Sequence, residues 1–159
     1  MKRKAAANTE VEAESLYSVD AYRPEESVGL LIGMLRSQLM AALDDELADL
    51  GLTGAQLPVL HWIRQTPDAT AATLCRSINS DTGSMTRMLD RLEDKGFVRR
   101  VRSQTDRRVV HLELTTAGGA LWPMINPRVV KVLNRFLKGF QHKELETLKI
   151  LLRRMLANA

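Results

Sequence analysis

The sequence has little of the two residue types that build disulfide frameworks and metal sites. It contains 1 cysteine and 3 histidines in 159 residues. A single cysteine excludes an internal disulfide framework. His61, His111 and His142 are scattered along the chain without the spacing of metal ligands. We therefore predict no metal site and no cofactor.

Long apolar segments are also absent. No apolar run approaches the roughly 20 residues that are needed to span a bilayer. The N-terminal stretch MKRKAAANTEVEAES lacks the apolar core of a secretory signal. These absences predict a cytoplasmic protein without a membrane partner.

The residue patterns of an enzyme are missing as well. The sequence offers no nucleophile with a neighbouring base, no metal cluster and no phosphate-binding loop, and Gly118-Gly119 alone is too weak a signal. The composition, 45% apolar and 26% charged, is ordinary for one globular domain. We therefore predict a binding protein and not an enzyme.

The most informative segment covers residues 81–115, which predicts a helix, a glycine stop and a β-hairpin in succession. Its first part has apolar residues at a 3.6-residue period and polar residues on the other face. Gly96 follows where a left-handed residue ends a helix at low cost. Two β-branched runs then flank the tip SQTDRR. The helix face consists of Met85, Met88, Leu89 and Leu92, and Val110, Leu112 and Leu114 share one face of the second strand. This order of elements suits a protein that reaches into DNA.

Positive charge is concentrated in the same segment. Residues 95–108 contain six basic residues and one acidic residue, a net charge of +5, whereas the whole chain carries +4. A basic cluster is typical of a surface that binds phosphates. A solvated hairpin that only keeps the protein soluble would carry the same charge, but the preceding helix favours nucleic acid. The basic residues are Lys95, Arg99, Arg100, Arg102, Arg107 and Arg108, and the acidic one is Asp106.

Three motifs of this segment resemble the MarR family of bacterial winged helix-turn-helix regulators. They are MTRMLDRLEDKGFVRR, the DRR of the hairpin tip and LTTAG after the second strand. The resemblance extends more weakly from about Val28 to the C-terminus. It implies a mainly α-helical fold with a small β-hairpin wing, six helices and an intertwined homodimer. It also implies a repressor that binds a pseudo-palindromic operator and is released by a small aromatic or phenolic carboxylate.

The chain divides into three predicted parts. Residues 1–24 show no sustained periodicity and are predicted to form a mobile arm. Residues 53–115 form the winged helix-turn-helix lobe, with Thr53 as the N-cap of its first helix. Residues 25–52 and 116–159 supply dimerisation helices, the latter interrupted by Pro123 and Pro127. A first helix of about 25 residues is roughly 38 Å long, which favours a dimer over packing of the terminal helices on each other within one chain.

The predicted recognition helix, which follows the turn NSDTG and ends at Gly96, supplies most of the candidate DNA contacts. Arg87 can reach a guanine edge or a phosphate, and Arg91 a phosphate, unless it pairs with Asp94. The helix N-terminus presents backbone amides to the sugar-phosphate chain. Ser84 is either a contact or the helix cap, and the same alternatives hold for Thr82. The predicted contacts of this helix are Asp81, Thr82, Gly83, Ser84, Thr86, Arg87 and Arg91.

The hairpin tip supplies the remaining DNA contacts. The resemblance implies that Arg107 enters the minor groove, whose negative potential attracts arginine. Arg102, Ser103 and Arg108 are predicted to contact DNA beside it. DNA would repel Asp106, so we predict that this carboxylate braces the tip through a bidentate pair with Arg108 or another arginine.

An effector pocket is expected where the first two helices and the start of the fifth meet, as in the family. Arg36 could pair with a carboxylate, although an interhelical ion pair is an equal alternative. His61 is either a polar pocket residue or a core residue. The candidate pocket residues are Arg36, Gln56, His61, Trp62, Met34 and Leu57.

Two further functions are alternatives. A general or architectural DNA-binding protein without an effector would carry the same basic hairpin. Some family members sense oxidants through a cysteine, so a redox-sensing repressor is the second alternative. Because free cysteine is among the most buried residue types, we predict that Cys75 packs in the core.

Overall fold

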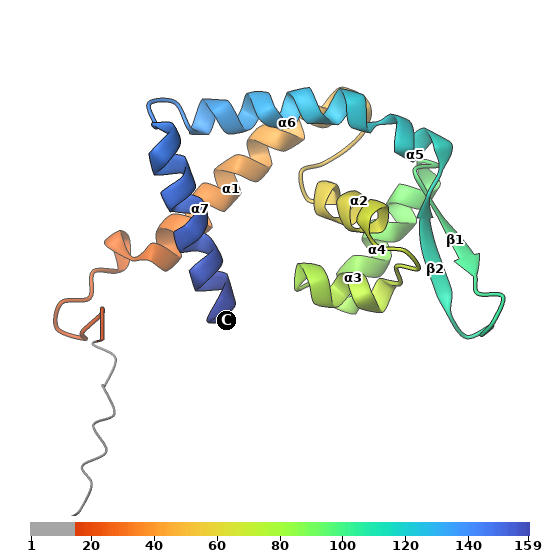
Figure 1. The fold of residues 1–159 in the computed structure, drawn as a ribbon, viewed down its shortest axis with the longest axis horizontal. Coiled ribbons are helices and arrows are strands. Elements are labelled where there is room, and N and C mark those ends of the chain that lie inside the picture. Colours follow the sequence, from red (N-terminus) through yellow and green to blue (C-terminus); the bar gives the residue numbers. More distant parts are fainter. Residues whose placement is uncertain (1–14) are drawn as a thin grey trace, which may run out of the picture. The chain divides into compact units, whose positions relative to one another are not determined.

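The computed structural model describes residues 15–159, which form seven α-helices, two 3-10 helices and one two-stranded sheet (Figure 1). The chain divides into two compact units between Leu35 and Arg36, inside the first long helix. In chain order the elements are η1 (Pro24–Glu26), α1 (Val28–Leu47), η2 (Ala48–Leu50), α2 (Gln56–Gln65), α3 (Ala71–Ile78), α4 (Thr82–Asp94), β1 (Val98–Arg102), β2 (Val110–Leu114), α5 (Thr116–Ala120), α6 (Trp122–Phe136) and α7 (His142–Ala157).

In the N-terminal unit, side chains that precede α1 cap its first turn. The Ser27 hydroxyl accepts a hydrogen bond from the backbone N–H of Leu30 at 3.2 Å, and the Tyr17 hydroxyl accepts one from Val28 at 3.1 Å. Tyr17 also packs edge-on against Tyr22, with ring centroids 5.9 Å apart. Residues 15–24 of the predicted arm thus include contacts that stabilise the start of α1. Residues 1–14 of that arm lie outside the described residues.

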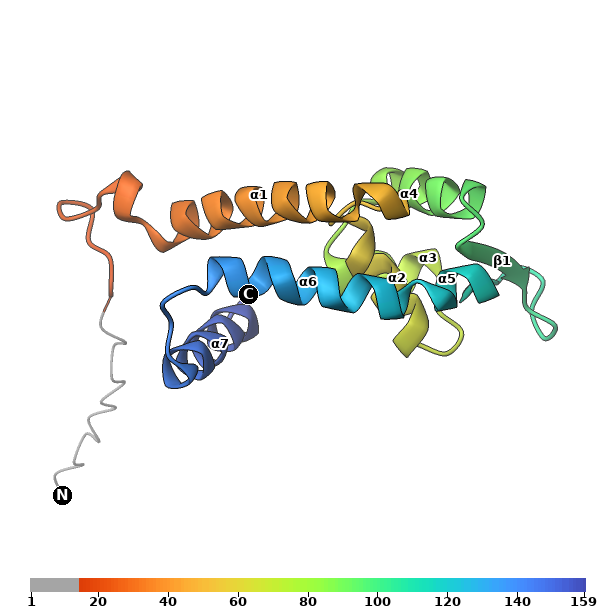
Figure 2. The ribbon, with the colours of Figure 1, turned by 90° about the horizontal axis from the view of Figure 1, so that it is seen from above.

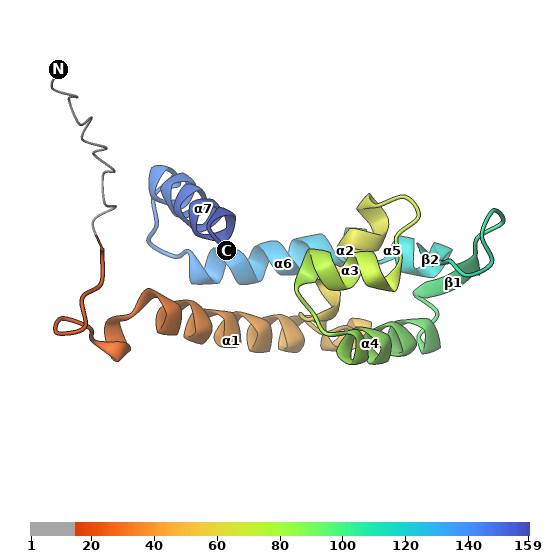
Figure 3. The same cartoon turned by 90° about the horizontal axis from the view of Figure 1, so that it is seen from below.

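In the second unit, α2, α3, α4 and the hairpin share one apolar core (Figure 3). The face of α4 predicted from the sequence is the face that is buried, with Met85, Leu89 and Leu92 at most 1% exposed. Leu60 of α2 and Leu74 of α3 are equally inaccessible. The mainly α-helical winged fold is therefore confirmed, and α4 is held with its polar face outward.

The hairpin pairs β1 and β2 in antiparallel register from Val98 opposite Leu114 to Arg102 opposite Val110. Leu112 is buried at 4% exposure, whereas Val110 near the tip is 38% exposed. The predicted apolar face therefore belongs to the core only at the base of the hairpin. The backbone N–H of Leu112 also donates to the carbonyl of Ala69 at 2.7 Å, which ties the hairpin to the loop before α3.

The LTTAG motif joins the hairpin to α5 by two side-chain hydrogen bonds and one close backbone contact. The Thr115 hydroxyl donates to the carbonyl of Gly96 at 2.6 Å and accepts from the N–H of Gly118 at 3.0 Å. A Cβ atom on Gly118 would lie 2.0 Å from the carbonyl oxygen of Phe97. Only glycine permits this approach, which explains the residue types of the motif.

Two predictions about helix boundaries were wrong. Thr53 is not the N-cap of α2, because its backbone N–H donates to Gln56 Oε1 at 3.1 Å and α2 begins at Gln56. Pro127 does not interrupt a helix, since it lies inside α6. It lacks the amide that would bond to the carbonyl of Pro123, so only one helical hydrogen bond is lost. The predicted break does exist at Leu121, where α5 ends and α6 begins, so the structure has one helix more than the six predicted.

Helix α6 is bound to the rest of the second unit by ion pairs, whereas α7 has no buried residue. Ion pairs join α6 to the chain around the end of α1, from Arg128 to Asp49 and from Lys131 to Glu46, the latter at 2.8 Å. The chain turns at Gly139, which has φ 90°, into α7 (Figure 2). None of the 16 residues of α7 is buried. In residues 15–159 no helix combines the length and the apolarity needed to cross a membrane.

Candidate nucleic-acid interface

The N-terminus of α4 is capped by Asp81. Its Oδ1 accepts the backbone N–H of Ser84 at 2.8 Å, and this hydrogen bond lowers the pKa of the Asp81 carboxyl below its ordinary value of 3.8. The prediction that Ser84 or Thr82 caps the helix was therefore wrong, and the carboxylate of Asp81 already has a structural partner. Thr82 and Gly83 of the first turn are exposed, and the backbone amides at this end of a helix have no intrahelical acceptor.

The exposed residues of the first turn surround Arg87. A guanidinium nitrogen of Arg87 donates to the Ser84 hydroxyl at 3.1 Å. A Cβ atom on Gly83 would lie 3.3 Å from Asp81 Oδ1 and 3.5 Å from the other guanidinium nitrogen, so both side chains lie close to this glycine. The Thr86 hydroxyl donates to the carbonyl of Thr82 at 2.8 Å. The Ser84 hydroxyl, three residues before it on the helix, thus orients the Arg87 side chain.

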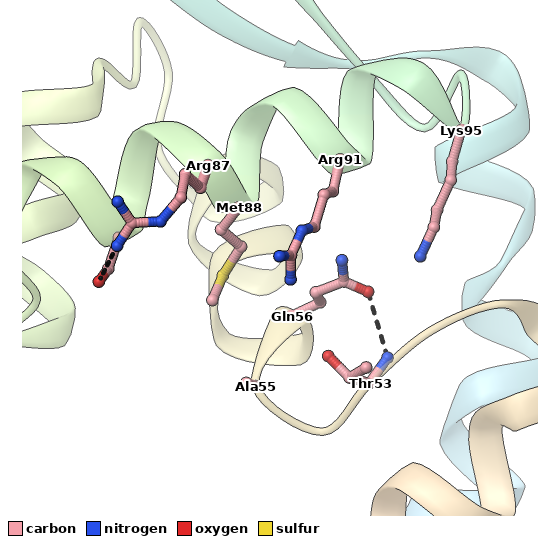
Figure 4. A pocket seen from close by; sticks show the side chains of 8 residues that line it. Thr53, Ala55, Gln56, Arg87, Met88, Arg91 and Lys95 are labelled. Atoms are coloured by element: carbon pink, nitrogen blue, oxygen red, sulfur yellow. Dashed lines mark hydrogen bonds between the residues drawn. The ribbon is translucent and has the colours of Figure 1, made fainter.

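Three basic side chains at four-residue intervals, Arg87, Arg91 and Lys95, lie along one side of α4 (Figure 4). They border a groove of about 280 Å³ that lies between α4 and the start of α2. Lys95 Nζ donates to the carbonyl of Gly51. Arg91 forms no ion pair within residues 15–159, so the predicted alternative of a pair with Asp94 was wrong. The groove is lined by Thr53, Ala55, Gln56, Ser84, Arg87, Met88, Arg91 and Lys95.

Two arginines of β1 near the base of the hairpin have acidic partners. Arg99 pairs with Glu113 at 2.6 Å, and Arg100 pairs with Asp90 and Glu93 of α4. The exposed arginines of the tip form no ion pair among the described residues; they are Arg102, Arg107 and Arg108. Within the hairpin, the positive charge that is free for a polyanion therefore lies at the tip.

Asp106 braces the tip through the backbone and not through a guanidinium. Its Oδ1 accepts the N–H of Arg108 at 2.9 Å, and its own N–H donates to the Ser103 hydroxyl at 3.3 Å. The Ser103 N–H in turn donates to the carbonyl of Val109 at 3.0 Å. The predicted bidentate ion pair with an arginine is therefore wrong, because the short side chain of aspartate closes a local turn instead. Ser103, a predicted DNA contact, forms its hydrogen bonds within the same turn, through both its hydroxyl and its backbone N–H.

A second, mostly apolar cavity of about 460 Å³ lies between the end of α1, α2 and α6. Of the six predicted pocket residues, Leu57, His61 and Trp62 line it. Gln56 is buried but lines the groove beside α4 instead. The cavity is lined by Met40, Leu43, Gly54, Leu57, Pro58, His61, Trp62, Trp122, Ile125, Asn126 and Val129.

The other two predicted pocket residues do not line this cavity. Arg36 is exposed on α1 and forms no ion pair in the described part of the chain, so the predicted interhelical ion pair is wrong, whereas its pairing with an effector carboxylate stays a prediction. Met34 is 51% exposed in the N-terminal unit. The sequence places both residues on the first helix but does not show which turn of that helix meets α2.

The start of the fifth predicted helix was expected to border the pocket, but the sequence interpretation named none of the residues that α6 contributes to its wall. Trp122, Ile125, Asn126 and Val129 recur at helical spacing, but the proline at 127 made this stretch look interrupted. Trp122 packs edge-on against His61 at 6.2 Å, and the Arg64 guanidinium lies 5.0 Å from its ring centroid. Its Nε1 is buried with no hydrogen-bond partner among the described residues.

Comparison with known proteins places this lobe in a family. The family model of the MarR family matches residues 52–110. The multiple antibiotic resistance protein MarR of Escherichia coli strain K12 is 36% identical over 130 residues, which cover 81% of this chain and 90% of that protein. The chain belongs to the MarR family.

Solved MarR structures share the fold. MarR from E. coli without ligand superposes with a TM-score of 0.71 at 34% identity, covering 82% of this chain and 97% of that one. A mutant MarR from E. coli, complexed with operator DNA, gives a TM-score of 0.74 at 35% identity and covers 80% of this chain and 92% of that one. The regulator SlyA is similar in fold, with a TM-score of 0.77 at 24% identity, covering 83% of this chain and 93% of that one.

The single cysteine of this MarR-family chain lies in the lobe. Cys75 is half-buried on α3 and packs against the apolar core. Its N-terminal neighbour Leu74 is 2% exposed and anchors this face of the helix. These contacts agree with the predicted packing role. No group of three or more potential metal ligands forms within residues 15–159.

Proposed function

We propose that this protein is a transcription regulator that binds operator DNA through α4 and the hairpin. The observation that carries the proposal is that one lobe presents Arg87 on the outer face of α4 and three unpaired arginines at the hairpin tip. Basic groups of this kind bind the phosphates of a duplex and reach its grooves. The likeness to a MarR structure that contains operator DNA, at 35% identity, supports the same use of the lobe.

The two elements have different roles in this proposal. Arg87 is assigned to the major groove, where a guanidinium can donate two hydrogen bonds to a guanine edge. Arg107, which is exposed at the tip, is assigned to the minor groove. The amides and hydroxyls at the start of α4 are assigned to the sugar-phosphate chain. Base selectivity therefore depends mainly on α4.

The active form is a homodimer in this proposal. The 16 residues of α7 include none that is buried, although Ile150, Leu151 and Met155 are 55%, 48% and 47% exposed. On α6, Val130 is 53% exposed. Apolar residues in such numbers on one helix are typical of an interface. A second copy of the chain would cover them and would place two copies of α4 about one DNA turn, ~34 Å, apart.

The cavity between the end of α1, α2 and α6 is the proposed effector site. An aromatic ligand would lie among Leu57, Trp62 and Trp122, within hydrogen-bond reach of His61 or Asn126. No lysine or arginine lines the cavity, and the Asp44 carboxylate binds the N–H of Gly54 in its wall at 2.6 Å. Burial of a carboxylate there would lack a counter-charge in the lining, since the Arg64 guanidinium is already engaged with the Trp122 ring, 5.0 Å from its centroid. The cavity therefore favours an uncharged phenol over an aromatic acid.

Effector binding is proposed to release DNA by population shift. A ligand that binds one spacing of the two lobes better than the other moves the equilibrium by its difference in affinity. The cavity joins the lobe to α6, so its occupation could change that spacing. If the free spacing fits the operator, the protein is a repressor that the effector inactivates.

Selection of duplexes from a random pool tests the proposal. The purified protein is expected to enrich a pseudo-palindrome and to bind it at least 1,000-fold more tightly than random DNA, on the order of known operators. An architectural DNA-binding protein would enrich no sequence. Release of the selected duplex by a phenol then separates an effector-controlled regulator from one without an effector.

A further inference from the structure

Arg100 joins the hairpin to the side of α4. Its Nη2 lies 2.6 Å from Asp90 Oδ1, and its Nη1 donates to Glu93 Oε2. The other oxygen of Glu93 accepts the backbone N–H of Arg100 at 3.2 Å. Strand β1 is thus bound to the last turns of α4 by a guanidinium and a main-chain amide of one residue. Charge-assisted bonds of this kind are short and directional.

The partners of Arg100 leave it little capacity for DNA. Its side chain is 33% exposed and lies between two carboxylates three residues apart on one helix face. The hydrogen bond that Arg100 donates to Asp90 is the main cause that raises the pKa of Arg100, so the clamp favours the charged guanidinium. A phosphate would have to displace both carboxylates to bind it. The neighbouring pair of Arg99 and Glu113 differs, because both of its members lie on the hairpin itself.

We propose that Arg100 is a positioning residue that fixes the angle between the hairpin and α4, and with it the distance from Arg87 to Arg107. This inference rests on the proposed DNA-binding function. β1 ends at Arg102 and Arg107 lies in the turn beyond it, so the lever from Arg100 to Arg107 is about 15 Å. A tilt of about 10° at Arg100 would therefore move the tip by roughly 3 Å. That displacement is larger than a hydrogen bond tolerates.

Glu93→Gln provides the sharpest test. A clamp that only masks charge and a clamp that fixes the angle predict opposite changes in the affinity of this variant for DNA. The probe is the duplex that the parent protein selects from a random pool. If the clamp only masks charge, loss of an acidic residue beside DNA will tighten binding. If the clamp fixes the angle, Glu93→Gln will weaken binding about tenfold, since the neutral amide holds the guanidinium less well. The matched control Glu113→Gln removes the same charge within the hairpin and should leave affinity unchanged or slightly higher.

Arg100→Gln separates positioning from phosphate contact by its salt dependence. We expect affinity to fall about tenfold with the slope of log K against log salt unchanged, whereas loss of a phosphate contact lowers that slope by about 0.9. Adding Asp90→Asn and Glu93→Gln to this variant removes the repulsion of the two freed carboxylates. The triple variant should remain weak. Thermal unfolding of each variant shows that it is folded at the temperature of the binding measurement.

Three outcomes would overturn the inference. They are unchanged or tighter binding by Glu93→Gln, a reduced salt slope for Arg100→Gln, and recovery of parent affinity in the triple variant. If the parent protein itself selects no duplex, the proposed function fails, and this inference with it. If the parent binds its selected duplex and Glu93→Gln binds equally well, only the positioning role fails.

Discussion

The carbonyl oxygen of Phe97 lies 2.0 Å from the position that a Cβ atom on Gly118 would occupy. Phe97 is the last residue before β1, and Gly118 lies in α5 after β2. The two ends of the hairpin thus meet by backbone contact, with the Thr115 hydroxyl bonded to Gly96 beside them. The backbone at Phe97 cannot shift without moving β1, and the backbone at Gly118 cannot shift without moving α5. The base of the hairpin is therefore held in one position.

Gly118→Ala is expected to lower the free energy of unfolding by about 3 kcal/mol, because a methyl group would overlap a carbonyl that cannot retreat. Chemical denaturation measures this loss. Gly119→Ala is the matched control, since a Cβ atom there meets nothing within 4 Å. The control should change stability by less than about 1 kcal/mol and in the stabilising direction, because alanine favours a helix. Equal stability of the two variants would contradict the close contact.

The cap of α4 predicts a pH dependence of stability. The folded-state pKa of Asp81 is lowered from 3.8, so its contribution is fully present above pH 3.8 and is lost as the pH falls toward the folded-state pKa. Asp81→Asn keeps an oxygen that accepts the N–H of Ser84 but cannot titrate. The stability difference between parent and Asp81→Asn should therefore shrink below pH 3.8. Thermal unfolding measures the stability of both proteins. If their difference stays constant from pH 6 to pH 2, the Asp81 carboxylate does not cap the helix in its charged form.

Two substitutions of Asp106 distinguish a hydrogen-bonded brace of the hairpin tip from an ionic one. Because its carboxylate accepts the N–H of Arg108 and pairs with no guanidinium in the described residues, Asp106→Asn should preserve the turn. Its affinity for the selected duplex should match or exceed that of the parent, since one negative charge near DNA is gone. Asp106→Ala should bind about three- to tenfold more weakly through disorder of the tip. Equal loss in both variants would favour an ionic brace.

Local patterns in the sequence predicted much of the fold and part of the site. The period of Met85, Leu89 and Leu92 identified the buried face of α4, because one helix face must meet the core. Gly96 has φ 71°, as a helix stop before a strand requires. These features depend only on neighbours in the chain, and a periodic pattern reports them directly.

Features that depend on distant contacts could not be predicted in this way. Arg100 is one basic residue among six in its window, and nothing local indicates that Asp90 and Glu93 neutralise it. Arg36 belongs to the same helical stripe as residues that do meet α2, so periodicity could not exclude it from the cavity. Trp122 was overlooked because Pro127 was interpreted as a break, although one missing amide does not end a helix whose other contacts hold.

Arg87 and Arg107 should differ in what their loss does to binding. Arg87→Ala is expected to cost about 1–3 kcal/mol and to relax base preference at one position of each half-site. Arg107→Ala should reduce the salt slope and the preference for A·T pairs in the flanking minor groove. Repeated duplex selection with each variant measures both effects. If Arg87→Ala retains the full base preference, its assignment to the major groove is wrong.

The effector cavity can be probed with the two tryptophans of the chain, since Trp62 and Trp122 both line it. We expect 2-naphthol to quench their fluorescence with at least tenfold higher affinity than 2-naphthoate, because no cation in the lining compensates a buried carboxylate. Arg36→Ala should leave both affinities unchanged. Tighter binding of 2-naphthoate, abolished by Arg36→Ala, would instead support the aromatic acid and the original assignment of Arg36.

The spacing of the two half-sites tests the central claim most directly. A homodimer that places one copy of α4 in each of two successive major grooves requires half-sites about one helical turn, 10–10.5 base pairs, apart. The measurement compares the selected duplex with the same duplex after insertion of five base pairs between its half-sites. We predict two chains per parent duplex and a loss of affinity of about 100-fold or more upon insertion. Unchanged affinity, with each half-site bound independently by one chain, would contradict the account.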